Sequence, residues 1–156
     1  MCCTLLDVPE IDKPHHVTCR HYAAGVGCTI HETRPPCCRP FQCHWSLLPH
    51  LPEDWRPDLV HFILWTQDAK QVIVEVDPDY PDAWLKEPVH SVLRSWSGPQ
   101  GLEVLVRVGP RMFMMFPEAD IDMGEQQEDK IIDYGYRLLF NGRREPFARF
   151  IDPPTT

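Results

Sequence analysis

Cysteine is absent from position 44 onward, although the first 43 positions of this 156-residue chain contain seven. Buried structural thiols have no reason to gather at one end of a chain. A metal site does, because several soft ligands must surround one point. The sequence therefore predicts a metal site in the N-terminal third, which contains Cys2, Cys3, Cys19, Cys28, Cys37, Cys38 and Cys43.

Long apolar runs are also lacking, since no stretch approaches the roughly 18 consecutive apolar residues of a membrane span. Residues 1–13 (MCCTLLDVPEIDK) lack the basic and apolar regions of a signal peptide. We therefore expect a cytoplasmic protein, whose thiols are kept reduced. The alternative is a disulfide framework, and the odd number of cysteines and their two adjacent pairs argue against it.

Positive charge is scarce, with 15 Lys and Arg against 23 Asp and Glu, and the formal net charge is −8. Such a chain lacks the excess of basic residues that attracts nucleic acid or an anionic membrane, and we expect it to bind neither. Residues 118–129 (EADIDMGEQQED) contain only acidic charges. That composition is typical of a solvated loop.

Common catalytic motifs are missing. The chain has no phosphate-binding glycine loop, no H-E-x-x-H motif and no G-x-S-x-G motif. No pair of carboxylates is evident near the cysteines, where Glu32 stands alone. A cysteine nucleophile with His21 or His44 as its base is the enzymatic alternative. The sequence leaves enzymatic activity open but favours a binding protein.

Proline is frequent, with 17 residues, and it favours turns and extended connections over long helices. Residues 1–57 are rich in cysteine, histidine and proline and show little periodicity. We expect loops and short turns there, with a helical turn near residues 41–48. A segment of this kind would fold poorly alone, which favours a metal that cross-links it.

From residue 58 onward, β-branched and apolar runs alternate with turn residues, and one helical pattern extends from near Pro88 to Gly98. The runs predict two hairpins, followed by one or two further strands: 58–66 with 71–77, 101–108 with 111–116, and 130–151. We therefore expect one α+β domain, 1–156. In it, the metal-binding segment 1–57 packs on a small antiparallel sheet with one or two helices, 58–156.

The cysteine spacings contain no C-x2-C pair, so they match no common zinc-finger or ferredoxin pattern. A family resemblance is carried instead by residues 27–45 (GCTIHETRPPCCRPFQCHW). This run resembles the GC-x-I-Y-E-x-RP-x-x-CR-x-F-x-C-x-W core of the CxxCxxCC, or YkgJ-type, family of bacterial proteins described as zinc- or iron-chelating. In the match Cys38 occupies the RPxxCR position and Cys37 is an extra residue.

The resemblance extends loosely over residues 1–57. Cys2-Cys3 resembles the end of the family's N-terminal CxxCC motif, and Cys19-Arg20-His21 resembles its middle C-x-H-C element. Tyr22 stands where that element often has a second cysteine, and His31 replaces a usual tyrosine. Fewer ligands are therefore available than in the fullest members, which argues against a large multinuclear cluster.

What the resemblance implies is metal chelation, with Cys3, Cys19, Cys28, Cys38 and Cys43 as the expected ligands. Zinc is the expected metal, because it accepts mixed Cys/His sets and irregular spacings. An iron–sulfur cluster, which four of these cysteines could hold, is the alternative. His15 and His16 are read as ordinary surface or core histidines.

The function expected from the sequence is that of a zinc-chelating protein with a structural or accessory role, in which a protein partner is conceivable but unidentified. The first alternative is an iron–sulfur protein with a redox or enzymatic role. A redox or metal sensor that uses labile ligation and the spare Cys37 is the second.

Overall fold

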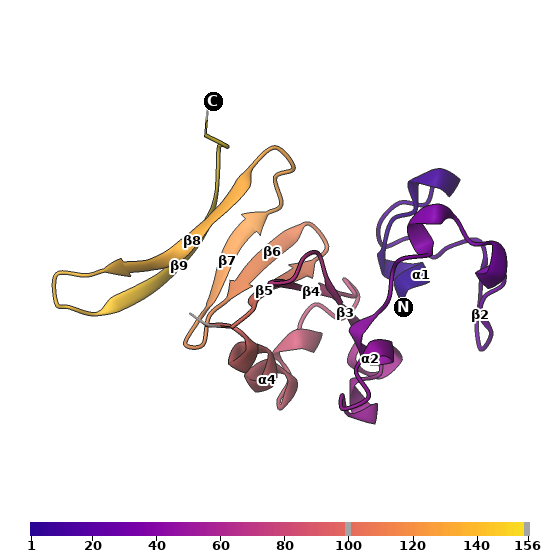
Figure 1. Ribbon diagram of the computed structural model, residues 1–156, viewed down its shortest axis with the longest axis horizontal. Coiled ribbons are helices and arrows are strands. Elements are labelled where there is room, and N and C mark those ends of the chain that lie inside the picture. Colours follow the sequence, from indigo (N-terminus) through magenta and orange to yellow (C-terminus); the bar gives the residue numbers. More distant parts are fainter. Residues whose placement is uncertain (99–100, 155–156) are drawn as a thin grey trace.

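A five-stranded mixed sheet with the strand order β3-β4-β5-β6-β7 forms the centre of the molecule (Figure 1). The computed structural model describes residues 1–98 and 101–154. The strands are β3 (Phe62–Thr66), β4 (Gln71–Val76), β5 (Glu103–Val108), β6 (Arg111–Met115) and β7 (Asp120–Glu125). The expected α+β class is confirmed, as are the two hairpins β3–β4 and β5–β6.

One face of this sheet is covered by helix α4 (Val89–Trp96) and the short 3-10 helix η5 (Ala83–Leu85). Alternating residues of β4, such as Val72 and Val74, face Leu93 of α4 in one fully buried cluster. Each such aliphatic side chain stabilises the fold by roughly 2 kcal/mol on burial. The helix begins just after Pro88, as its sequence pattern predicts.

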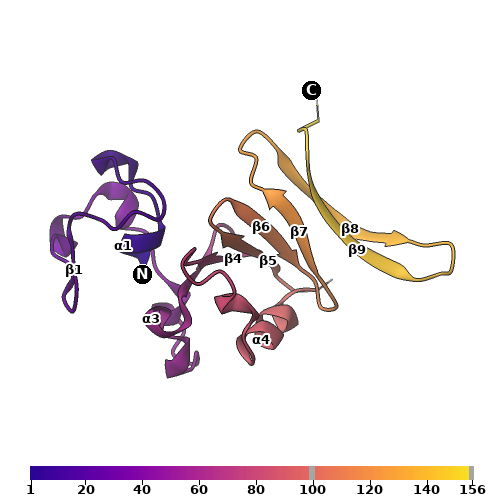
Figure 2. The ribbon, with the colours of Figure 1, turned by 180° about the vertical axis from the view of Figure 1, so that it is seen from behind.

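The opposite face is covered by two different parts of the chain. A hairpin of β8 (Ile131–Leu138) and β9 (Arg144–Ile151) packs Ala148 and Phe150 against Ile73 and Leu105. The N-terminal segment lies toward the β3 edge of the sheet and the hairpin lies toward the β7 edge, as both views show (Figures 1 and 2). On this face, Glu75 contacts the N-terminal segment, and Arg107 lines a cavity that is formed mainly by that segment.

The N-terminal segment consists of loops and single turns, as expected from its composition. Its elements are α1 (Cys2–Leu5), η1 (Pro9–Ile11), β1 (Tyr22–Ala23), β2 (Gly27–Cys28), η2 (His31–Thr33), η3 (Pro36–Cys38), α2 (His44–Leu47) and η4 (Glu53–Trp55). A last short helix, α3 (Pro57–Val60), leads into β3. No helix within the described ranges is both long and apolar enough to cross a membrane.

The structure differs from the sequence expectations in three places. The sheet is not purely antiparallel, because β4 and β5 are parallel and are connected by the α4 crossover. The expectation of a solvated loop over residues 118–129 is wrong for Asp120–Glu125, which form β7 and pair with β6. Its apolar side chains, Ile121 and Met123, pack against the core beneath the β8–β9 hairpin, and Asp122 pairs with Arg111.

The third difference is at the start of the expected first hairpin. Residues 58–60 are helical rather than extended, because Pro57 suits the first turn of α3.

Candidate metal centre

Six of the seven cysteines line one cavity of about 380 Å³ in the N-terminal segment. They come from four separate stretches of chain and are Cys2, Cys3, Cys19, Cys28, Cys37 and Cys38. Apolar side chains such as Leu6, Ile30 and Phe41 form much of the remaining wall, and Trp65 and Arg107 of the sheet complete it. Soft sulfur donors thus surround one space that is shielded by apolar groups, which is chemistry suited to a thiophilic metal.

Helix α1 positions the first two cysteines. Leu5 is completely buried and accepts a 3.0 Å hydrogen bond through its carbonyl from the amide of His16. The carbonyl of Cys3 accepts a second one, 2.8 Å long, from the amide of Cys19. These two bonds hold the start of the chain against residues 16–19, so that Cys3 and the buried Cys19 share one side of the cavity.

The β1–β2 hairpin brings Cys28 to the same place. Tyr22 is paired with Cys28 in this hairpin, and the amide of Tyr22 donates to the carbonyl of Cys19 over 2.9 Å. The turn between the strands contains Gly25 at φ +76°, a left-handed conformation that favours glycine. The amide of His21 also donates to the sulfur of Cys19 at 3.5 Å.

Cys37 and Cys38 lie on η3, where adjacent prolines precede them. Arg34 and Arg39 each donate to the other's carbonyl, at 3.4 and 3.1 Å, and this closes the loop that holds the pair. Cys37 is bound to Glu10: its amide donates to Oε1 at 3.1 Å and its thiol donates to Oε2 at 2.7 Å. Glu10 is a carboxylate near the cysteines that the sequence did not single out.

Cys43 stands apart from the other six cysteines. It precedes helix α2, where its carbonyl accepts bonds from the amide and hydroxyl of Ser46, at 2.9 and 2.7 Å. It is not among the residues that line the cavity. The cavity therefore brings together Cys3, Cys19, Cys28 and Cys38 of the five expected ligands, and adds Cys2 and Cys37.

The thiols of the cavity differ in acidity. A hydrogen bond from the Cys3 thiol lowers the pKa of Cys2 to about 6, and the same bond raises the pKa of Cys3. Desolvation and the hydrogen bond to Glu10 raise the pKa of Cys37 to about 12, and desolvation raises that of Cys38. A bound cation must therefore displace protons from most of these sulfurs, and its affinity falls as the pH is lowered.

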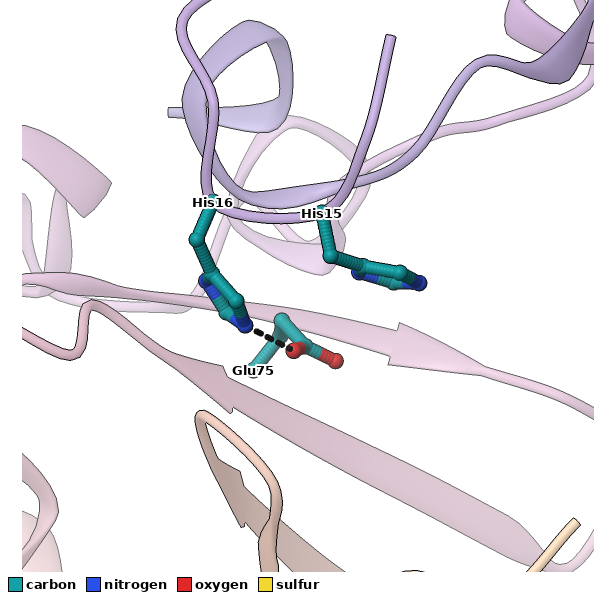
Figure 3. A group of neighbouring side chains, drawn as sticks. All are labelled: His15, His16 and Glu75. Carbon is teal, nitrogen blue, oxygen red and sulfur yellow. Dashed lines mark ion pairs between the residues drawn. The ribbon is translucent and has the colours of Figure 1, made fainter.

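The sulfurs surround the cavity without converging on a single point. Among the described residues, no three of them lie within 4.8 Å of one another, whereas the ligand atoms of His15, His16 and Glu75 do (Figure 3). This second group joins the loop after η1 to strand β4. This group could not be predicted from the sequence, because Glu75 is far from the histidines along the chain and lies within an apolar run typical of a strand.

Comparisons of the chain with models of protein families, with curated proteins and with solved structures found no match in any of the three. The resemblance of residues 27–45 to the CxxCxxCC family therefore stays a prediction, and the functional argument depends on the geometry of the chain itself.

Proposed function

We propose that this protein chelates a metal through its cysteine-lined cavity, with zinc in a structural or accessory role. The observation that supports this most strongly is the meeting of six cysteines from four stretches of chain around one space. Thiolates bind Zn²⁺ tightly, and ligands from separate loops cross-link a segment that has few buried apolar side chains of its own.

The composition of the segment supports a metal that contributes to folding. Its turns are short, and its buried apolar side chains up to residue 50 are few: Leu5, Val8 and Cys19. So small a core supplies little hydrophobic stabilisation, and natural segments of this size commonly add a metal or disulfides. All seven cysteines are free thiols.

An iron–sulfur cluster with a redox or enzymatic role is the second candidate, and the width of the cavity favours it. Four thiolates around one zinc ion at about 2.3 Å would lie about 3.8 Å from one another. No three sulfurs among the described cysteines come within 4.8 Å. A cluster of several iron atoms spans more space than a single ion and accepts more widely separated cysteines.

Elemental analysis of protein purified without oxygen, combined with its visible spectrum, tests both candidates. Zinc bound stoichiometrically to a colourless protein supports the first, and iron with acid-labile sulfide in a brown protein supports the second. A protein that retains neither metal after purification and takes up neither on reconstitution contradicts both.

A further inference from the structure

We propose that His15, His16 and Glu75 form a second metal site, which binds a divalent transition-metal cation through two imidazoles and one carboxylate. It differs from the cysteine cavity in ligand chemistry, and only His15 of its three residues also lines that cavity. Its ligand atoms all lie within 4.8 Å of one another, although one of the residues is on the sheet and two are on a loop (Figure 3).

The carboxylate of Glu75 is the strongest reason to expect a cation here. Glu75 is 1 % exposed, and its Oε2 has no hydrogen-bond partner. The basic groups that approach it are too distant for hydrogen bonds: His16 Nε2 lies 3.9 Å from Oε1, and Arg107 Nη1 lies 3.8 Å from Oε2. Burying a carboxylate without direct partners is costly, and a cation bound to Oε1 would offset that cost.

Arg107 does not occupy the place of such a cation. It approaches Oε2, while Oε1 faces the histidine loop. Zinc lies about 2.0–2.2 Å from nitrogen and oxygen ligands, so two such ligands at a tetrahedral angle are about 3.4 Å apart. The 3.9 Å separation of His16 Nε2 and Glu75 Oε1 therefore needs to shorten by only about half an ångström to hold the ion.

The backbone of the loop turns both histidines toward the strand. His16 has a φ of +58°, a left-handed conformation that is uncommon for a residue other than glycine. This conformation lets two consecutive side chains lie on one side of the loop, with ring centroids 5.7 Å apart. In Figure 3 both rings lie over Glu75.

Asp7 completes the arrangement from outside. Its Oδ1 lies 3.1 Å from Nε2 of His15, which leaves Nδ1 of that ring available for a metal. A carboxylate that binds the second nitrogen of a ligating histidine fixes the orientation of the ring and raises its basicity. His15 is half-exposed, so that a cation could enter and keep positions open to solvent.

Two histidines and one carboxylate are the ligands of many catalytic zinc sites and of mononuclear non-haem iron(II) sites. The site therefore suits Zn²⁺, Fe²⁺ or Co²⁺ rather than Mg²⁺ or Ca²⁺, which prefer oxygen ligands alone. Co²⁺ is the most informative probe, because thiolate ligands give it a strong near-ultraviolet charge-transfer band and imidazole or carboxylate ligands do not.

The test is a Co²⁺ titration of the reduced full-length chain without oxygen, with bound cobalt counted after desalting. We expect Glu75→Gln and His15→Asn each to bind one equivalent less than the wild type, with an unchanged thiolate band. Asp7→Asn should weaken this equivalent by about tenfold. The exposed His50 provides the control, since His50→Asn should bind as the wild type does.

Equal cobalt binding by the wild type and His15→Asn would overturn the proposal, and so would a loss of the thiolate band in His15→Asn. His15 is half-exposed, so its variant decides the question even if Glu75→Gln does not fold. A missing thiolate band in the wild type would contradict the cysteine site alone, because the difference between the wild type and His15→Asn would still report the second site.

Discussion

The amide of Cys19 donates a 2.8 Å hydrogen bond to the carbonyl of Cys3. This bond connects the first helical turn to the loop that precedes β1, and it brings together two cysteines that are distant in the sequence. Cys28 joins them because its hairpin partner, Tyr22, is bonded to Cys19. A short chain of backbone contacts therefore positions three of the proposed ligands before any metal is considered.

The reactivity of Cys37 tests whether this residue stays a protonated thiol while its neighbour Cys38 binds the metal. Its thiol donates to Glu10, and its pKa is raised to about 12. In metal-free, reduced protein at pH 8, Glu10→Gln should lower that pKa and speed alkylation of Cys37 by iodoacetamide several-fold, because the thiolate is the nucleophile. Peptide mass spectrometry would locate the modified residue.

Glu32→Gln is the matched control, because Glu32 is an exposed carboxylate of the same segment. It should leave the rate of Cys37 alkylation unchanged. If Glu10→Gln also left the rate unchanged, Glu10 would not hold the proton of Cys37. Cys37→Ser should retain the bound metal, while Cys38→Ser should lose it.

Removal of the metal should loosen the N-terminal segment and spare the sheet. The segment depends on a few backbone bonds, such as that from the amide of Thr29 to the carbonyl of His21, 2.8 Å long. After treatment with a chelator, we expect the amides of Cys19 and Thr29 to lose hydrogen-exchange protection by at least tenfold. The amide of Val74, in the central strand β4, should keep its protection.

Simultaneous loss of protection at Val74 would show that the segment and the sheet unfold as one unit. Unchanged protection at Cys19 and Thr29 would show that the segment does not need the metal. The first result would contradict the independence of the sheet, and the second would contradict a metal that cross-links the segment.

The burial of Glu75 should make the free energy of unfolding of the metal-free protein depend on pH. Burial raises the pKa of Glu75 to about 7, from an ordinary value of 4.5. The folded state therefore binds more protons than the unfolded state between these two values, and the free energy of unfolding falls as the pH rises from about 4.5 to about 7. The shift corresponds to at most about 3 kcal/mol at pH 8.

Urea unfolding of chelator-treated protein at several pH values would measure this effect. Glu75→Gln should be more stable than the wild type at pH 8 and should lose most of the dependence on pH in this range. Glu128→Gln, at an exposed position, should behave as the wild type does. A wild-type stability that increased from pH 5 to pH 7 would show that Glu75 is not buried as a costly charge.

Sequence periodicity was sufficient for the elements whose apolar residues alternate or repeat clearly, such as α4 and the hairpin of β3 and β4. It failed for β7, because acidic side chains outnumber Ile121 and Met123 and hide the strand pattern. What makes β7 a strand is the pairing with β6, which only the tertiary structure provides.

The candidate site was predictable to a similar degree. The concentration of cysteines identified the segment, but only the fold separates Cys43 from the six cysteines of the cavity. Glu10 and Glu75 could not be found from the sequence, because each meets its partners through contacts between residues far apart in the chain.

The metal content of cysteine variants tests the central claim most directly. Protein purified without oxygen should lose its bound zinc or iron in Cys28→Ser, which removes a sulfur from the cavity. Cys43→Ser, which changes a cysteine outside it, should retain the metal at the wild-type stoichiometry. Equal metal content in the wild type and Cys28→Ser, or loss in Cys43→Ser alone, would contradict a metal centre in the cysteine-lined cavity.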